Sequence, residues 1–237
     1  SPNDILFIDE IHRLNKLIEE VLYPAMESRT LDIIIGKGPS ARTIQIELQP
    51  FTLIAATTRP ALISSPLRSR FTGGIFRLDF YKNSEIEQIL GRSSKILGVQ
   101  ISDEAKKEIA IRSRFTPRLA NRILKRSRDV GQIAGKNIID GETVGQTLDL
   151  LEIDEFGLEK SDKRILEIII NKFNGGPVGV KTIAAAASEE EATIEEVYEP
   201  YLMQLGFLER TARGRLATEK AYEYLGIKPK NIQEKLL

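Results

Sequence analysis

The feature that most constrains this chain is an apolar run near its first residue that ends in two adjacent carboxylates. Ile5–Ile8 are apolar without interruption, and Asp9 and Glu10 come directly after them. A continuous apolar run of this length is typical of a strand buried on both faces, as in a parallel sheet covered by helices. Ligands of such sheets bind outside the carboxyl ends of the strands, so the two acids stand where a ligand site is expected.

Adjacent residues at a strand end point in different directions, so the two acids can have different tasks. One carboxylate can join the shell of a Mg²⁺ ion while the other orients or deprotonates a water. The alternative is a buried strand that ends in acids by chance. A second apolar run, Phe51–Ala56, favours the first interpretation because it ends in Thr57 and Thr58, whose hydroxyls suit contact with a phosphate or its attacking water. For His12 a structural role is favoured over a catalytic one.

Composition narrows the class of protein. The chain has 237 residues, 41% of them apolar and 29% charged, which describes about two globular domains. No apolar run is long enough to span a membrane. A single His and no Cys exclude a zinc site built from these residues. We expect a cytoplasmic protein, and because the formal net charge is zero, any nucleic-acid binding must come from a local basic patch.

Two further segments accompany the acidic strand. Residues 31–35 and 43–48 are strand-like runs around a Gly/Pro turn and predict a hairpin, whose isoleucines form either a small local core or a docking surface. The segment Ser65–Phe71 contains Arg68 and Arg70 two positions apart. Such a pair is often a surface ion pair, but its order behind the acidic strand and the Thr strand favours arginines that stabilise a transferring phosphoryl group.

The rest of the chain is mainly helical. Residues 81–151 predict four short helices, with a capping box at Ser84, an N-cap at Ser102 and Pro117 at a first helical position. Beyond them, three helices followed by a basic hairpin predict a winged helix. The third of these helices is acidic, so the phosphates of DNA would repel it from a groove. The expected DNA contact is therefore the hairpin, which contains Arg210, Arg213 and Arg215.

A phosphate-binding loop of the form GxxxxGK[ST] is absent from the sequence. We therefore expect the chain to be part of a longer protein and to be inactive as an ATPase by itself. We also expect the strands of Leu6 and Leu53 to expose apolar surface, because part of their sheet would be missing.

Several motifs together resemble the RuvB family of AAA+ motors, which drive branch migration of Holliday junctions with RuvA. They are Asp9-Glu10-Ile11-His12-Arg13-Leu14, Ala56-Thr57-Thr58-Arg59, Pro66-Leu67-Arg68-Ser69-Arg70-Phe71, Thr116-Pro117-Arg118 and Gly206-Phe207-Leu208-x-Arg210-Thr211-x-Arg213-Gly214-Arg215. The resemblance implies an α/β plus all-α fold. It consists of a truncated AAA+ P-loop NTPase large domain in residues 1–80, a four-helix lid in 81–155 and a C-terminal winged helix in 156–237.

The resemblance also implies roles for single residues. Asp9 is the expected Mg²⁺-shell acid, Glu10 the base, Thr58 the sensor 1 residue and Arg70 the arginine finger offered to a neighbouring subunit's ATP. Further nucleotide contacts are expected at Glu27, Ser28, Arg29, Tyr81 and Arg118, and DNA contacts at Arg210, Arg213 and Arg215. Phe71-Thr72-Gly73-Gly74 departs from the family by one extra residue, which leaves the course of that loop open.

The implied function is ATP-dependent DNA translocation at Holliday junctions in recombination, repair and the SOS response. The implied cofactors are ATP and Mg²⁺. The implied partners are junction or duplex DNA, RuvA docked on the hairpin 31–48, RuvC, and further copies of the chain in a homohexamer. Two alternatives remain. One is a non-catalytic winged-helix DNA-binding module. The other is a different AAA+ protein such as a clamp-loader subunit, which is disfavoured because a winged helix follows the lid.

Overall fold

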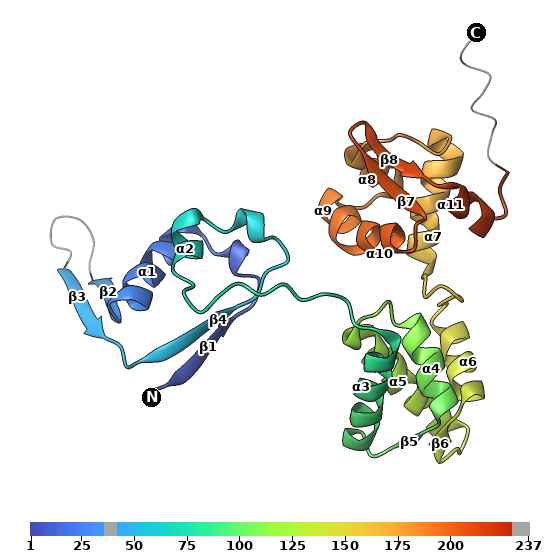
Figure 1. Ribbon diagram of the computed structural model, residues 1–237, viewed down its shortest axis with the longest axis horizontal. Helices are drawn as coiled ribbons and strands as arrows, with labels where there is room; N and C mark the ends of the chain where they lie inside the picture. The colour runs from blue at the N-terminus through green and yellow to red at the C-terminus, as the bar shows by residue number, and fades with distance from the viewer. Residues whose placement is uncertain (36–41, 229–237) are drawn as a thin grey trace, which may run out of the picture. The chain divides into compact units, whose positions relative to one another are not determined.

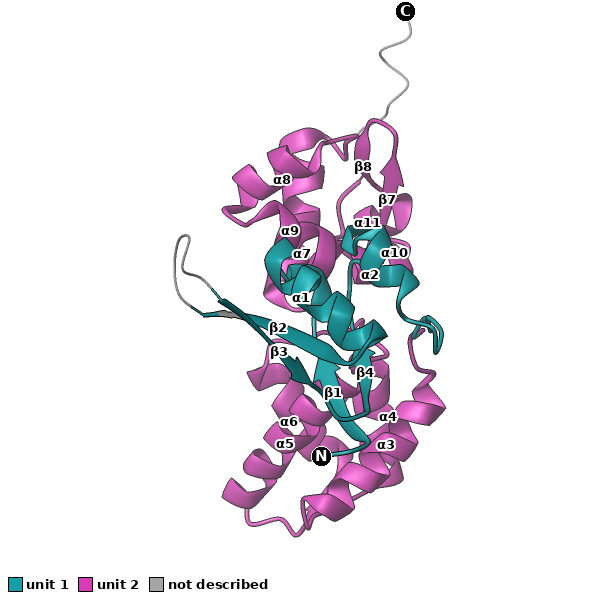
Figure 2. Ribbon diagram, turned by 90° about the vertical axis from the view of Figure 1, so that its left-hand side faces the viewer, with its two compact units in different colours: residues 1–78 teal, residues 79–237 magenta. Residues whose placement is uncertain are grey.

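The computed structural model describes residues 1–35 and 42–228. They divide into two compact units, residues 1–78 and residues 79–237, which are described separately below (Figures 1 and 2). No helix among the described residues is long and apolar enough to cross a bilayer.

The first unit contains two separate two-stranded sheets and two helices. Its elements are β1 (Asp4–Ile8), α1 (Lys16–Glu27), β2 (Thr30–Ile35), β3 (Arg42–Glu47), β4 (Phe51–Ala55) and α2 (Ser65–Ser69). β1 and β4 pair in parallel, with Leu6 opposite Leu53. The backbone N–H of Ala56 donates to the Ile8 carbonyl at 2.9 Å, and that of Ile11 donates to the Ala56 carbonyl at 3.0 Å. The pairing therefore continues past both strand ends and aligns the residues that follow them.

The prediction that the apolar strand is buried on both faces is wrong for this structure. Ile5, Leu6 and Phe7 are 67%, 45% and 57% exposed. Among the described residues β1 and β4 pair only with each other, so most of their side chains remain in contact with water. The prediction of exposed apolar surface is thereby confirmed for both strands, since Ile54 in the strand of Leu53 is 46% exposed.

The predicted hairpin is confirmed in its two strands. β2 and β3 pair antiparallel, with Ile33 opposite Ile44, while the Gly/Pro turn lies outside the described residues. The isoleucines do not form a local core, since four of them are between 39% and 55% exposed: Ile33, Ile35, Ile44 and Ile46. The surface interpretation of the hairpin therefore fits the structure.

The second unit begins with the four predicted helices. They are α3 (Asn83–Ile96), α4 (Asp103–Arg112), α5 (Pro117–Ile133) and α6 (Gly141–Leu150), joined by a short parallel pair, β5 (Gln100–Ile101) and β6 (Ile138–Ile139). Ser102 accepts a hydrogen bond from the Ala105 N–H at 3.1 Å, and Pro117 opens α5, as predicted. The capping box predicted at Ser84 is wrong: α3 begins two residues after Tyr81, and Glu85 accepts from the Lys82 N–H instead.

A winged helix follows within the same unit. Its elements are α7 (Lys160–Glu167), α8 (Val180–Ala187), α9 (Glu191–Thr193), α10 (Glu199–Gln204), β7 (Leu208–Thr211), β8 (Gly214–Ala217) and α11 (Glu219–Tyr224). The lid and the winged helix have separate apolar cores, one drawn from residues 86–153 and the other from residues 158–221. Each domain therefore has its own buried apolar cluster, and Phe115 of the lid packs against the second one.

Candidate functional site

The acids of the first unit meet the threonines of the neighbouring strand end. Glu10 leaves β1 in the left-handed region, with φ of 49°, which turns its side chain towards β4. One carboxylate oxygen accepts from the Thr58 backbone N–H at 3.1 Å and from the Thr58 hydroxyl at 3.2 Å. Parallel pairing thus joins residues 48 positions apart at the carboxyl ends of two strands.

These hydrogen bonds lower the pKa of Glu10 below its usual value. The largest cause is the backbone N–H of Thr58; the Thr58 hydroxyl and the neighbouring His12 add to it. A hydrogen bond to the charged form of a carboxyl group favours that form. Glu10 is therefore an ionised acceptor at neutral pH, able to accept a hydrogen bond from a water and so to orient it.

His12 and Asp9 complete this end of the sheet. The His12 Nδ1 atom lies 2.8 Å from the Thr57 hydroxyl and 3.1 Å from the Glu10 carboxylate, and its side chain is only 8% exposed. This buried contact fits the structural role favoured for His12. Asp9 is exposed, and one of its oxygens accepts from the Glu10 N–H at 3.0 Å.

Arg70 lies in a second group of contacts, formed by α1 and α2. Its Nη1 donates to the Pro66 carbonyl at 2.7 Å, its Nη2 lies 3.0 Å from Glu27, and its guanidinium stands 4.2 Å from the centre of the Tyr23 ring. The Arg70 Nε is buried without a hydrogen-bond partner. The structure therefore brings together two of the predicted nucleotide contacts, Arg70 and Glu27.

The two residues after Glu27 end the helix. The Ser28 hydroxyl donates to the Pro24 carbonyl at 3.0 Å and lies 2.8 Å from the Thr30 hydroxyl, while Arg29 has a positive φ of 57°. These contacts account for the turn from α1 into β2. They leave the predicted nucleotide contacts at Ser28 and Arg29 untested.

The predicted nucleotide residues of the lid flank one short loop. The Tyr81 N–H donates to the Phe115 carbonyl at 3.2 Å, and Arg118 stands exposed in the first turn of α5, three residues after Phe115. Tyr81 and Arg118 are therefore connected through the loop between α4 and α5.

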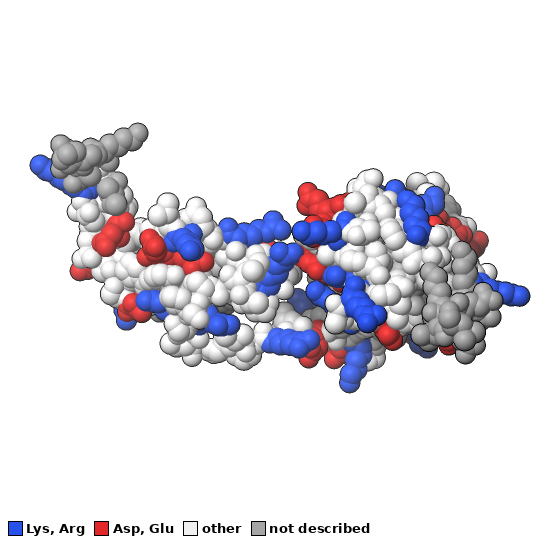
Figure 3. All heavy atoms as spheres, turned by 90° about the horizontal axis from the view of Figure 1, so that it is seen from above, with Lys and Arg blue, Asp and Glu red and all other residues white. Residues whose placement is uncertain are grey.

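The arginines of the wing differ sharply in their surroundings. Arg210 and Arg215 are direct cross-strand partners in β7 and β8. Arg210 has a side chain that is 58% exposed, and Arg213 at the tip is exposed. Together with Lys181, at the start of α8, they line a shallow hollow beside the wing. Elsewhere, Figure 3 shows basic and acidic side chains interspersed over the face that it draws.

Arg215 also lines this hollow, but most of its side chain is enclosed, and its predicted contact with a DNA phosphate stays a prediction. Its side chain is 8% exposed, and its Nε donates to Glu199 at 2.5 Å while its Nη2 donates to Glu195 at 2.9 Å. The pKa of Arg215 is raised, first by the hydrogen bond to Glu199. The sequence predicted only that the acidic helix would bind DNA poorly. In the structure its Glu195 and Glu199 bind Arg215 and so attach the wing to the rest of the domain.

Sequence reasoning missed two basic residues. Lys181 follows a Gly-rich turn and carries no motif, so only its position beside the wing identifies it. Arg114 lies two residues before the motif Thr116-Pro117-Arg118, and this position is the only signal in the sequence that could have pointed to it. It forms a buried ion pair with Asp162, 48 positions away.

Family models match almost the whole described chain. Residues 1–78 match the Holliday junction DNA helicase RuvB P-loop domain, residues 81–154 the RuvB AAA lid domain, and residues 155–226 the RuvB C-terminal winged helix domain. The boundary between the two compact units, after residue 78, coincides with the end of the first match.

Curated proteins and solved structures agree with these models. A Holliday junction branch migration complex subunit RuvB from Dehalococcoides mccartyi is 57% identical over 98% of this chain and 66% of its own length. A RuvB subunit from Chloroflexus aggregans is 56% identical over 96% of this chain and 65% of its own length. The chain thus spans slightly less than two thirds of these relatives. The Thermotoga maritima RuvB Holliday junction branch migration motor matches with a TM-score of 0.83 and 48% identity, over 96% of this chain and 71% of that one.

Proposed function

The chain belongs to the RuvB family, and from this premise we propose that it works in an ATP-driven motor that moves Holliday junctions along DNA. The observation that carries the proposal is the pair of hydrogen bonds from Thr58 to the Glu10 carboxylate. They connect the expected base to the expected sensor across two parallel strands, at the sheet edge where ligands of α/β folds bind.

The residues at this edge suit ATP and Mg²⁺. Asp9 is exposed and has oxygen lone pairs free beyond its single hydrogen bond, which is the donor type that Mg²⁺ accepts through one or two carboxylates together with waters and phosphates. Within residues 1–35 and 42–228 no cluster of three metal-binding side chains exists, so the protein would supply few of the ligands. Bound Mg²⁺ would neutralise charge on the phosphates. Glu10 orients the attacking water.

Arg70 supports the proposal by the exposure of its acidic partner. Glu27, its carboxylate partner, is 59% exposed, and the Arg70 Nε has no hydrogen-bond partner. A guanidinium with an exposed partner can exchange it for a phosphate at small cost, because surface ion pairs contribute only about 0–1 kcal/mol. We assign Arg70 as the arginine finger acting on the ATP of a neighbouring copy in a hexamer, with Glu27, Ser28 and Arg29 at the same interface.

The partners follow from the remaining surfaces. The exposed isoleucines of β2 and β3 provide an apolar surface for RuvA, and Arg210 and Arg213 provide phosphate contacts for junction or duplex DNA. Tyr81 and Arg118 of the lid would contact the nucleotide. Association with RuvC and a cytoplasmic location complete the proposal and rest on the family.

Substitution of Glu10 tests the catalytic assignment in the full-length protein that contains this chain. Glu10→Gln keeps the shape and should lower the rate of ATP hydrolysis by about 10²–10⁴-fold while ATP binding is retained, because general base catalysis contributes that range. Hydrolysis is measured by phosphate release and binding by calorimetry. Glu20→Gln, an exposed acid on α1, is the matched control and should leave the rate unchanged.

An unchanged rate in Glu10→Gln would contradict the catalytic role. DNA binding by the winged helix, which has an apolar core of its own, would then be the function left to this chain.

A further inference from the structure

The loop between α4 and α5 has an unusual backbone. Arg114 and Phe115 both have positive φ, 51° and 56°, although neither is glycine. Consecutive residues in this region carry a conformational cost and persist only where the surroundings hold them. The Phe115 carbonyl accepts from the Tyr81 N–H, while the Arg114 side chain reaches the winged helix.

Arg114 is held by three hydrogen bonds on the winged-helix side. Its Nη2 and Nη1 donate to the two Asp162 carboxylate oxygens at 2.5 and 3.3 Å, and its Nε donates to the Gly157 carbonyl at 2.8 Å. Its guanidinium also lies 5.1 Å from the centre of the Tyr201 ring. The ion pair is enclosed, with Arg114 15% and Asp162 1% exposed. Bidentate pairing fixes orientation as well as distance.

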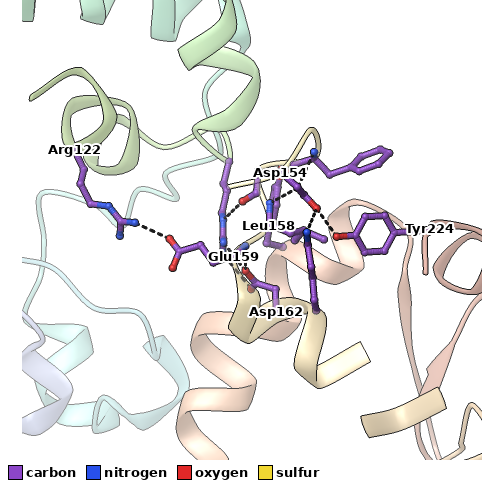
Figure 4. Close-up of polar contacts among 11 residues, drawn as sticks. Arg122, Asp154, Leu158, Glu159, Asp162 and Tyr224 are labelled. Atoms are coloured by element: carbon purple, nitrogen blue, oxygen red, sulfur yellow. Dashed lines mark hydrogen bonds and ion pairs between the residues drawn. The ribbon is translucent and has the colours of Figure 1, made fainter. Parts of the chain in front are cut away.

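Asp162 has a second task in the same place. It accepts from the Glu159 N–H at 2.8 Å and so caps the first turn of α7 (Figure 4). Burial raises the pKa of Asp162, and the Arg114 charge opposes that shift. Without Arg114 the carboxylate would remain buried with its charge uncompensated, which is unfavourable.

The linker that joins the two domains is held by further contacts. The Asp154 carboxylate accepts from the N–H groups of Phe156 and Leu158 and from the Tyr224 hydroxyl (Figure 4). Gly157 has φ of +74°, and a Cβ on it would stand 2.8 Å from the Arg112 carbonyl. A larger residue there would separate α4 from the linker, so the two domains are in close backbone contact at this point.

Contacts continue from this joint to the wing. Tyr201, beneath the Arg114 guanidinium, belongs to α10 and donates to the Phe156 carbonyl at 2.6 Å. Glu199 begins the same helix and holds Arg215 of β8. A set of contacts therefore leads from the Tyr81 backbone N–H, through the loop of Phe115 and Arg114, to Tyr201 in the helix whose Glu199 holds the wing.

We propose that Arg114 is a positioning residue that clamps the lid to the winged helix, so that movement of the lid on nucleotide binding or release is delivered to the DNA-contacting wing. The inference rests on the proposed function, which assigns nucleotide binding to the lid and DNA binding to the wing. The joint combines the Arg114–Asp162 ion pair with the Phe115 ring, which packs against the winged-helix core, and each domain has its own buried apolar cluster. Loss of the clamp should therefore loosen the two domains from each other rather than unfold either one.

Distance measurements test the clamp directly in the full-length protein. This chain has no cysteine, and any cysteine elsewhere in the full-length protein is first replaced by serine. Spin labels are then placed at Ile133→Cys on the lid, a position 90% exposed, and at Met203→Cys on the winged helix, 41% exposed. With Arg114 present, the distance distribution between the labels should be narrow and the same with and without ATP. Arg114→Gln should broaden it. Lys160→Gln, which breaks the exposed pair with Glu152, is the control and should leave it narrow.

The second readout is the ATP consumed per base pair of junction movement. Arg114→Gln should raise this ratio by at least about tenfold, because hydrolysis would continue while movement of the lid is no longer delivered to the wing. Asp162→Asn, which keeps the shape of the cap, should do the same, and the double variant should be no worse than either single one. Thermal unfolding confirms that each variant is folded.

The outcomes separate the two proposals. If the full-length protein hydrolyses no ATP, the proposed function fails, while the label distances still decide whether Arg114 clamps the domains. A narrow distribution in both Arg114→Gln and Asp162→Asn, or an unchanged ratio of ATP to movement in an active protein, would overturn the inference.

Discussion

Arg70 of the first unit rests against Glu27, whose side chain is 59% exposed, whereas Arg215 of the second unit is enclosed with Glu199, whose side chain is 3% exposed. Both arginines belong to motifs that predict contact with a phosphate. An exposed carboxylate remains solvated when its arginine leaves, but a buried one is left with an uncompensated charge. The comparison teaches that the burial of the partner, rather than the motif, decides whether an arginine is free to bind a ligand.

The largest effect is expected for the loosely held arginine. Arg70→Ala in the full-length protein should lower ATP hydrolysis by about 10³–10⁵-fold and leave nucleotide binding nearly unchanged, because an arginine finger acts on the transition state. Phosphate release and calorimetry measure the two quantities. Lys16→Ala, which removes an exposed cation on α1 with no assigned role, is the control. Mixing Arg70→Ala with Glu10→Gln subunits should restore some activity if the finger acts between copies, and no recovery at any ratio would favour action within one copy.

The buried arginine should affect stability first. Arg215→Ala leaves Glu199 charged and without its partner inside the winged helix, which should cost about 3–5 kcal/mol of the free energy of unfolding. Urea unfolding measures the change. It is followed by circular dichroism, because the chain has no Trp whose fluorescence could report unfolding. Glu199→Gln should recover part of the loss in the Arg215→Ala background. A variant with full stability but weakened DNA binding would place Arg215 on the phosphate after all.

The smallest effect on stability is expected at Arg210. Its contact with Glu195 is 3.6 Å long and exposed, so Arg210→Ala should change the free energy of unfolding by no more than about 0.5 kcal/mol. DNA affinity should fall similarly for all sequences, and the slope of log K against log salt should become shallower by about one unit for the single lost phosphate contact. Equal slopes before and after the substitution would remove Arg210 from the DNA surface.

Local signals in the sequence predicted the elements and their order well. Ser102 caps α4, Pro117 opens α5 and the strands of the hairpin pair as expected, because each depends on residues only a few positions apart. The capping box predicted at Ser84 failed because two helix starts were possible. Glu87 could cap a helix that starts after Ser84, and Glu85 caps the observed helix that starts after Lys82. The prediction that β1 is buried failed because exposure depends on neighbouring elements and not on the run itself.

The sequence by itself determined that two parallel strand ends carry acids and threonines, and that helices and a basic hairpin follow. Only the tertiary structure decided that Thr58 binds Glu10, that Arg215 turns inward to Glu199 and that Arg114 reaches Asp162. The reason is physical. Apolar periodicity and capping act between neighbours along the chain, whereas the partner of a charged side chain is set by packing that brings distant segments together and excludes water from the pair.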